Sequence, residues 1–197
     1  MNTFRDLGGI STFHPDEGEA YNEDPLFLRS VARTVAVMMA FQKARQPLSL
    51  SQVATAAGID RSAAQRIVHS LQKLDVIARD PADRGYLPGL RILDMTHDLL
   101  RLNPMLQRAN PIMLELRRRV HERVDLSLFD DVRVVYAVRM PSKHEIFSAT
   151  LVGHAVPTYC TAGGVASLSK LPDERIADIV GRSDLTPFTP NTIQSLA

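Results

Sequence analysis

The stretch from Ser49 to Leu74 constrains the fold most, because it carries signals for two short helices separated by a glycine turn. Ser49-Leu50-Ser51-Gln52 fits a capping box, in which the serine hydroxyl caps the backbone and the glutamine side chain reaches back to the cap amide. Gly58 is suited to end this helix in the left-handed conformation, and Ile59 can anchor the turn that follows. Asp60 is suited to cap a second helix. Helix, tight turn, helix is the layout of a helix-turn-helix.

The second helix of this motif separates its residues by face at the helical period. Its apolar side is predicted to hold Ala63, Ile67, Leu71 and Leu74. Its other side carries Ser62, Gln65, His69 and Gln72, flanked by Arg61, Arg66 and Lys73. Gln can pair with adenine and Arg with guanine, whereas Ser and Lys can hold phosphates. This side has no acid after the cap, so a DNA major groove is favoured over the alternative of an ordinary solvated helix face.

A wing is predicted directly after the motif. Two short β-compatible segments flank residues 79–85, whose Pro, Asp and Gly content is typical of a turn. Arg79 and Arg84 can reach backbone phosphates, but Asp80 and Asp83 beside them weaken such contacts. We therefore expect a wing that positions the domain and does not specify sequence.

A first helix is predicted before the motif. Ser30 is a plausible N-cap, and Val31, Val35 and Met38 recur at helical spacing, which predicts that they face the core. Pro47 excludes further helix, so this helix is expected to end near it.

Local charge favours the DNA-binding interpretation. Residues 1–28 hold one Arg against six acids, whereas residues 29–85 hold nine Lys or Arg against four acids. A basic module after an acidic segment suits a domain that neutralises phosphates. Residues 1–27 have no sustained apolar period and are expected to form a disordered acidic tail.

Targeting, redox and catalytic signals are weak. The longest apolar run, Val35–Phe41, is far shorter than the ~20 residues that span a bilayer. With no apolar signal-peptide segment, we expect a cytoplasmic protein without a membrane partner. Cys160 is the only cysteine, and a buried or incidental thiol is favoured over a reactive one. The six histidines are scattered, so we expect no catalytic residue, metal or cofactor.

Two helices are predicted after the wing. Residues 90–102 read as a helix that links two domains. Asn110-Pro111 can start the next helix as cap and first residue, with Ile112, Leu116 and Val120 on its buried side.

The remainder of the chain is predicted to mix strands and helices. From Val124 the apolar period shifts towards two. Strands are predicted over 125–129 and 132–138, with a turn at Asp130-Asp131 between them, and a third strand over 145–151. The predicted helices begin after Thr161 and at Asp173. The second half is therefore expected to be α+β, with helices beside an antiparallel sheet.

The order and spacing of several short motifs resemble the isocitrate-lyase-regulator (IclR) family of bacterial transcription factors from about Ser30 onwards. The residues that carry the resemblance are Ser30-Val31, Leu48-Ser49-Leu50, Arg66, Tyr86, Gly89, Val134-Val135-Tyr136, Gly153, Val156-Pro157, Thr161-Ala162-Gly163, Leu185-Thr186-Pro187 and Thr189-Pro190-Asn191-Thr192-Ile193.

The resemblance implies a winged helix-turn-helix over 28–88, a linker helix over 89–103 and a partial GAF-like α/β effector-binding domain over 104–197. Such regulators are usually dimers or dimers of dimers and bind small, often acidic or aromatic, metabolites. The loop that matches Thr161, Ala162 and Gly163 lines their effector pocket, and amides at a helix N-terminus favour an anion.

The resemblance also implies that the second domain is incomplete. Family members continue beyond the segment that matches 189–193, through strands that complete the sheet. We therefore expect a second half that is less stable than the winged helix and does not bind effector with normal affinity.

The sequence thus predicts a sequence-specific DNA-binding regulator that responds to an aromatic or short-chain carboxylate, with duplex DNA, the effector and a second copy as partners. The candidate DNA-binding residues are Ser49, Arg61, Ser62, Gln65, Arg66, His69 and Arg84. One alternative is a methyltransferase-like enzyme that dimerises through a winged helix, but no Gly-rich nucleotide loop or nucleophile elbow is present. A protein-interaction module would not need Gln65, Arg66 and His69 on one exposed side.

Overall fold

The computed structural model describes residues 24–42, 44, 46–142 and 152–192. They divide between Leu99 and Leu100 into two compact units. The first unit is helical with a small hairpin, and the second is built around a sheet. The predicted α+β fold class, with a winged helix-turn-helix followed by a helix and an antiparallel sheet, is confirmed.

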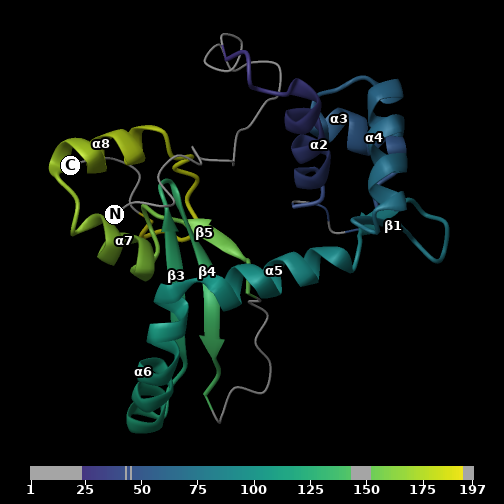
Figure 1. Ribbon diagram of the computed structural model, residues 1–197. Helices are drawn as coiled ribbons and strands as arrows, with labels where there is room; N and C mark the ends of the chain where they lie inside the picture. Colours follow the sequence, from purple (N-terminus) through teal and green to yellow (C-terminus); the bar gives the residue numbers. More distant parts are fainter. Residues whose placement is uncertain (1–23, 43, 45, 143–151, 193–197) are drawn as a thin grey trace. The chain divides into compact units, whose positions relative to one another are not determined.

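The first unit is a winged helix. Its elements are α2 (Arg29–Met39), α3 (Leu50–Ala57), α4 (Arg61–Lys73), β1 (Ile77–Arg79) and β2 (Tyr86–Pro88) (Figure 1). The strands pair antiparallel, and Leu48 adds to the edge of the hairpin through two backbone hydrogen bonds with Tyr86, of 3.0 and 2.8 Å. The core consists of Ala36, Val37, Val53, Ala57, Val68, Leu71, Val76 and Ile77.

The buried face of α2 differs from the prediction. Val31 is 54% exposed and Val35 38%, whereas Ala32, Ala36 and Val37 are buried. The expectation that Val31 and Val35 face the core was therefore wrong. Two of the three buried residues are alanines, whose small side chains let α2 pack closely against α3 and α4.

The bounds of α2 also differ from the prediction. Leu28 is the extended N-cap residue, so Ser30 lies inside the first turn and does not cap the helix. The helix ends at Met39, well before Pro47. Pro47 therefore does not determine where α2 ends.

The caps of the helix-turn-helix are those predicted. The Ser49 hydroxyl accepts a hydrogen bond from the Gln52 amide at 3.3 Å, and the Gln52 side chain accepts one from the Ser49 amide at 2.8 Å. Gly58 ends α3 with a φ of 66°, a conformation that glycine adopts without steric cost. The Asp60 carboxylate accepts from the Ala63 amide at 2.8 Å and caps α4.

The buried side of α4 is close to the predicted one. Its buried residues are Ala63, Ala64, Val68 and Leu71, and Ile67 packs half-buried against the same core. Leu74 is 58% exposed, so its predicted place in the core was wrong. The helix ends at Lys73, and Leu74 is its C-cap residue. The Leu74 side chain therefore no longer follows the helical spacing that would direct it into the core.

The helix α5 (Arg91–Leu102) forms as predicted but buries none of its residues. Its apolar residues are gathered on one side, since Asp94, His97, Asp98 and Arg101 occupy the other. Met95, Leu99 and Leu102 are all about half exposed or more. Within the described residues, α5 is therefore an amphipathic helix whose apolar side is largely uncovered, apart from Ile92, which packs against the core of the first unit.

The helix α6 (Pro104–Val120) begins earlier than predicted. Asn103 is its N-cap, and the Asn103 side-chain oxygen accepts hydrogen bonds from the amides of Met105 and Leu106 at 3.0 and 3.2 Å. Asn110-Pro111 does not start the helix, and Pro111 lies inside it.

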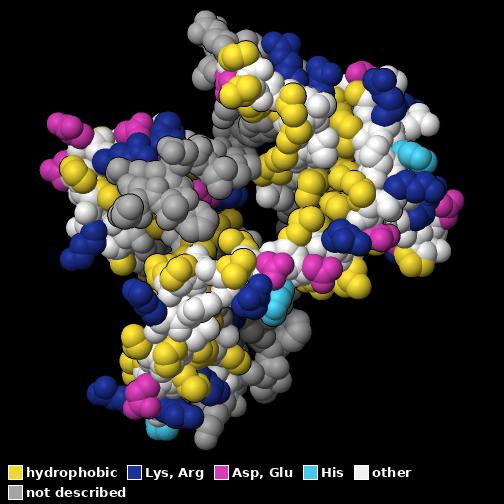
Figure 2. Space-filling model, in the orientation of Figure 1, with side chains coloured by type: hydrophobic (Ala, Val, Ile, Leu, Met, Phe, Trp, Pro, Cys, Tyr) yellow, Lys and Arg dark blue, Asp and Glu magenta, His cyan; other side chains and the backbone are white. Residues whose placement is uncertain are grey.

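The buried side of α6 was also predicted wrongly. Ile112, Leu116 and Val120 are exposed, and the buried residues are Leu106 and Met113. This side packs against the sheet of the second unit. Hydrophobic side chains consequently reach the surface along α6 (Figure 2).

The sheet of the second unit is antiparallel in the order β3-β4-β5. Its strands are β3 (Val124–Asp130), β4 (Arg133–Met140) and β5 (Ala155–Pro157). The predicted hairpin around Asp130-Asp131 is confirmed, with Asp131 at a φ of 57° in the turn. The predicted strand at 145–151 lies outside the described residues, as do residues 1–23 of the predicted tail and residues 193–197.

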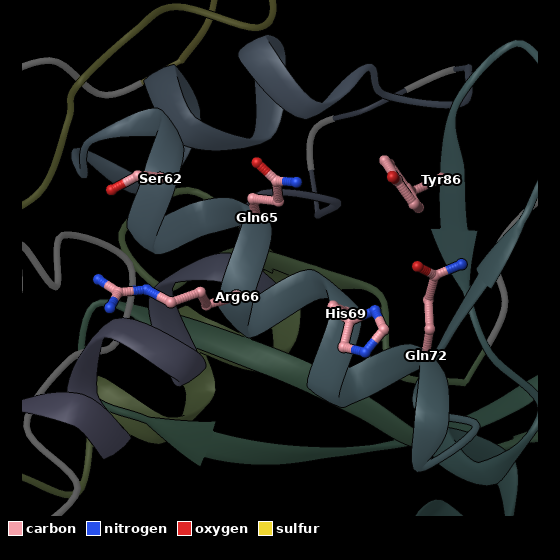
Figure 3. A pocket seen from close by; sticks show the side chains of 6 residues that line it. All are labelled: Ser62, Gln65, Arg66, His69, Gln72 and Tyr86. Carbon is pink, nitrogen blue, oxygen red and sulfur yellow. The ribbon is translucent and has the colours of Figure 1, made fainter.

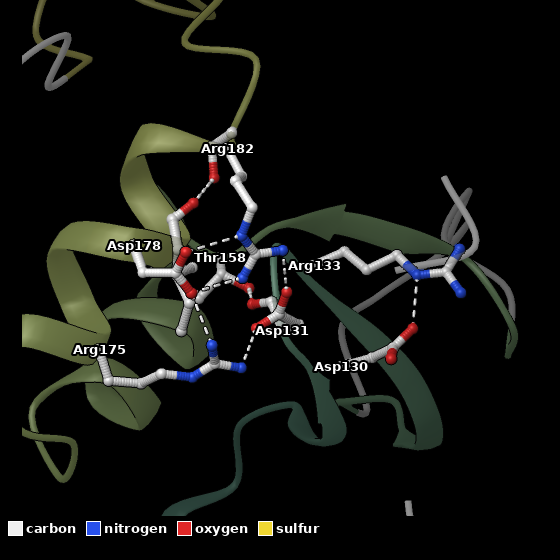
Figure 4. Close-up of polar contacts among 9 residues, drawn as sticks. Asp130, Asp131, Arg133, Thr158, Arg175, Asp178 and Arg182 are labelled. Carbon is white, nitrogen blue, oxygen red and sulfur yellow. Dashed lines mark hydrogen bonds and ion pairs between the residues drawn. The ribbon is translucent and has the colours of Figure 1, made fainter. Parts of the chain in front are cut away.

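Two short helices follow the sheet, α7 (Ala162–Leu168) and α8 (Asp173–Gly181), where helices were predicted. An ion-pair cluster joins α8 to the β3–β4 turn (Figure 4). Asp131 pairs with Arg175 at 2.8 Å and with Arg182 at 2.6 Å, and both arginines also pair with Asp178. The Thr158 hydroxyl donates to the Asp131 carbonyl at 2.7 Å, so the turn is held from two sides.

Candidate nucleic-acid interface

The exposed side of α4 forms one wall of a groove of about 530 Å³. The residues that line it are Ser62, Gln65, Arg66, His69 and Gln72 of α4 together with Tyr86 of β2 (Figure 3). The helical period places these α4 residues on one side because Ala64, Val68 and Leu71 anchor the opposite side in the core. The groove is therefore a direct consequence of how α4 packs.

The chemistry of the groove is that of a hydrogen-bonding surface with positive charge. Gln65, Arg66 and His69 are all exposed, and none of the lining residues is acidic. Amide and guanidinium groups can form paired hydrogen bonds with the edges of adenine and guanine. A groove lined in this way suits a nucleic acid better than an apolar ligand.

The acid nearest the start of α4 is engaged by the helix itself. The Ser62 hydroxyl donates to the Asp60 carboxylate at 2.6 Å. This hydrogen bond and the one from the Ala63 amide lower the pKa of Asp60. Asp60 is thus ionised at neutral pH and stabilises the N-terminus of α4, where negative charge is favourable.

The wing holds its two arginines in internal ion pairs. Asp80 is buried and accepts three hydrogen bonds from Arg84, from its amide at 3.2 Å and from its guanidinium at 2.8 and 3.1 Å. The Arg84 contact lowers the pKa of Asp80. Arg79 pairs with Asp83 at 2.7 Å. Each wing arginine therefore has a carboxylate partner within the turn, as the sequence had indicated.

The predicted DNA-binding residues do not all lie in the groove. Ser62, Gln65, Arg66 and His69 line it. Arg61 is exposed at the first position of α4, Ser49 serves as the α3 cap, and Arg84 lies in the wing turn.

Tyr86 is the lining residue that sequence reasoning missed. From the sequence alone, Tyr86 is a landmark of the family resemblance and directly follows the predicted wing turn. The available signal was an aromatic residue directly after the turn of a predicted wing, near basic residues.

The predicted effector-binding residues lie in the second unit. Thr161 is the N-cap residue of α7, and its hydroxyl donates to the Pro157 carbonyl at 2.7 Å. Thr161 lines a hollow of about 300 Å³ together with Val156, Pro157, Cys160, Val165, Phe188, Thr189, Asn191 and Thr192. Ala162 and Gly163 do not line this hollow. A side chain at Gly163 would instead point towards Ser127 of β3.

Within the described residues, none of the helices is both long and apolar enough to cross a membrane. The same part of the chain contains no cluster of three His, Cys, Asp or Glu side chains suited to a metal ion.

Two family models match the chain. The model described as the IclR helix-turn-helix domain matches residues 30–81, and the one described as the bacterial transcriptional regulator IclR C-terminal matches residues 97–197. The second match alone covers more than half of the chain.

Individual relatives are transcriptional regulators as well. The chain is 30% identical over 176 residues to the Pca regulon regulatory protein of Pseudomonas putida, a match that covers 89% of this chain and 60% of the relative. An IclR regulator from Alicyclobacillus acidocaldarius has a similar fold, with a TM-score of 0.72, 22% identity and coverage of 86% of this chain and 68% of that one. An IclR homologue from Microbacterium hydrocarbonoxydans, solved with 4-hydroxybenzoate, matches with a TM-score of 0.66, 21% identity and coverage of 84% and 68%.

Proposed function

The chain belongs to the IclR family of bacterial transcriptional regulators, and on that premise we propose that it binds duplex DNA with the groove side of α4 in the major groove. The families and relatives that it matches are regulators and not enzymes, which removes the methyltransferase alternative. The chain spans about 60% of the length of the Pca regulon regulatory protein.

One observation carries the proposal: α4 follows a helix-turn-helix turn and presents Gln65, Arg66 and His69 on one exposed, acid-free side. A recognition helix reads base edges in the major groove with side chains placed in this way. Ser49, Arg61, Ser62 and Arg84 are assigned to the same interface as phosphate-contacting or positioning residues.

The proposal is tested by selecting duplexes from a randomised library with the whole chain. We expect a recurrent sequence to emerge, and its affinity should fall steeply with salt because phosphate contacts release counterions. An unselected duplex of mixed sequence serves as the control and should bind more weakly. Failure to retain any duplex at low salt would overturn the proposal.

We further propose that the second unit binds a small aromatic or short-chain carboxylate near Thr161, Ala162 and Gly163. The hollow beside Thr161 has apolar walls from Val156, Val165 and Phe188. Thr192 and Asn191 supply hydroxyl and amide groups that suit a carboxylate. The Microbacterium homologue was solved with a ligand of this chemical class.

The effector proposal is tested by calorimetric titration with 4-hydroxybenzoate and with acetate. Gly163→Leu should abolish binding while leaving DNA binding intact, because a leucine there would press against Ser127 of β3 and displace the start of α7, where Thr161 lines the hollow. Gly181→Leu is the matched control, since nothing lies within 4 Å of a side chain built there. Equal binding by both variants would remove Gly163 from the site.

We propose that the protein acts as a homodimer with a DNA-binding domain over 28–88, a linker helix over 89–103 and an effector domain over 104–197. The uncovered apolar side of α5 supports a second copy as its partner. Helix-turn-helix dimers read two half-sites, so dimerisation next to the winged helix would set their spacing.

A further inference from the structure

Tyr86 belongs to the wing strand β2 but lines the same groove as the recognition side of α4 (Figure 3). Its ring packs against the core of the first unit. Its backbone amide donates a hydrogen bond to the Leu48 carbonyl, and its carbonyl accepts one from the Leu48 amide. The side chain is half-buried, with part of it open to the groove. The phenol is therefore held at the groove by a rigid strand.

Arg79 and Asp83 hold this phenol from the wing side. The Arg79 Nη1 donates a hydrogen bond to the Tyr86 Oη at 3.1 Å, and the Arg79 guanidinium carbon lies 5.0 Å from the centre of the Tyr86 ring. The Arg79 Nε donates to an Asp83 carboxylate oxygen at 2.7 Å. The guanidinium is thereby fixed between a carboxylate and an aromatic ring.

The direction of these bonds determines what Tyr86 can do. A guanidinium only donates hydrogen bonds, so the Tyr86 oxygen is the acceptor in its contact with Arg79. The phenolic O–H is not used by that contact and can donate to a further acceptor. A hydroxyl whose oxygen already accepts a hydrogen bond is a stronger donor, because the accepted bond polarises the phenol.

The charge balance distinguishes Tyr86 from the cationic residues of the interface. Asp83 neutralises Arg79, so the Tyr86 side of the groove offers a neutral donor, whereas Arg66 on α4 offers a cation. Phosphate oxygens on the DNA backbone accept hydrogen bonds from tyrosine hydroxyls as well as from cations.

We propose that Tyr86 contacts a DNA backbone phosphate through its phenolic O–H, and that Arg79, paired with Asp83, is the positioning residue that orients it. The inference rests on the proposed DNA-binding function. It assigns a DNA contact to the strand residue that directly follows the wing turn, in addition to the role proposed for Arg84 within the turn.

The test measures binding of the whole chain to a mixed-sequence duplex by fluorescence anisotropy over a salt series. Tyr86→Phe keeps the ring and its packing but removes the O–H, so affinity should fall about five- to twentyfold. The salt slope should not change, because no cation is lost. A duplex selected by the protein should lose the same factor, because phosphates carry no sequence information.

Tyr136→Phe is the matched control. Tyr136 lies in the second unit, with the Arg139 guanidinium carbon 6.0 Å from its ring centre, so it is also a tyrosine beside an arginine. Its DNA affinity should equal that of the unmodified protein. Thermal melting of all variants checks that the first unit stays folded.

A double-mutant cycle tests the positioning role. The change in the logarithm of affinity caused by Tyr86→Phe should be less than half as large in an Arg79→Gln variant as in the unmodified protein, because Arg79 no longer orients the phenol. Full additivity would overturn the positioning role of Arg79.

The remaining outcomes separate the inference from the function on which it rests. If the unmodified chain binds duplex DNA and Tyr86→Phe binds equally well, the phosphate contact is overturned and the proposed function stands. If Tyr86→Phe lowered the slope of log affinity against log salt by about the amount expected for one lost cation, the neutral-donor mechanism would be overturned. If the unmodified chain binds no duplex, both fall.

Discussion

Two adjacent glycines in α7 have different surroundings. A side-chain carbon built on Gly164 would lie 2.1 Å from the Thr158 carbonyl oxygen, which is backbone and cannot rotate away. One built on Gly163 would lie 3.8 Å from the Ser127 hydroxyl oxygen, an ordinary contact. The close approach of α7 to the β5 end therefore requires glycine at position 164.

The first prediction follows from this difference. Gly164→Ala should destabilise the second unit by roughly 1–3 kcal/mol or more, as overpacking of a close contact does. Gly163→Ala should stay within about 1 kcal/mol of the unmodified protein, because alanine favours the helix. Urea denaturation followed by far-ultraviolet circular dichroism measures both. Equal stabilities for the two variants would show that α7 can move away from Thr158.

At the residue scale, the sequence predicted the recognition side of α4 well and the groove incompletely. Gln65, Arg66 and His69 are exposed as expected, because polar and apolar residues alternate at the helical period along α4. Tyr86 could not be placed beside them from a pattern. Its position depends on how the hairpin packs against α4, which is a tertiary contact.

The starts of helices show why element boundaries are harder to predict. Asn103-Pro104 and Asn110-Pro111 give the same start signal two helical turns apart. The structure uses the first, where Asn103 caps the helix, and accommodates Pro111 inside it. Proline lacks the amide proton of a regular helical residue, so this tolerance depends on packing that local sequence does not reveal.

The buried faces show the same dependence on packing. In α2, alanines face the core and two valines face outwards, although valine is the more apolar residue. A pattern based on side-chain size alone assigns the core to the valines. The close approach of α3 and α4 reverses that choice.

The second prediction concerns the attachment of α8. Asp131 is paired with both Arg175 and Arg182, whereas the adjacent Asp130 pairs with Arg133 of its own hairpin (Figure 4). Asp131→Asn should increase hydrogen exchange of the α8 amides severalfold, because the charge that holds both arginines is lost and asparagine still tolerates the positive φ.

Asp130→Asn is the control for this measurement and should leave exchange in α8 unchanged. If the two variants affect α8 equally, the cluster does not attach the helix to the turn.

At the scale of the whole molecule, the order of elements was sufficient to predict the fold class. It was not sufficient to predict that no residue of α5 is fully buried among the described residues, because burial depends on what packs against a helix. An amphipathic helix with an uncovered apolar side is expected to associate.

The third prediction follows from the exposed side of α5. Leu99→Glu should weaken self-association at least about tenfold, because a charge replaces a side chain whose burial contributes roughly 1.5–3 kcal/mol. His97→Glu, on the polar side of the same helix, should leave it unchanged. Sedimentation equilibrium measures both. A monomeric unmodified chain would contradict the proposed homodimer.

The most direct test of the central claim measures whether α4 reads bases. Gln65→Ala should reduce affinity for a selected duplex by about 1–3 kcal/mol and leave affinity for a mixed-sequence duplex almost unchanged. Gln107→Ala, on α6 of the second unit, is the matched control and should change neither affinity. The contradicting result is an equal loss on both duplexes, or no loss on either, since a base-reading side chain must distinguish the two.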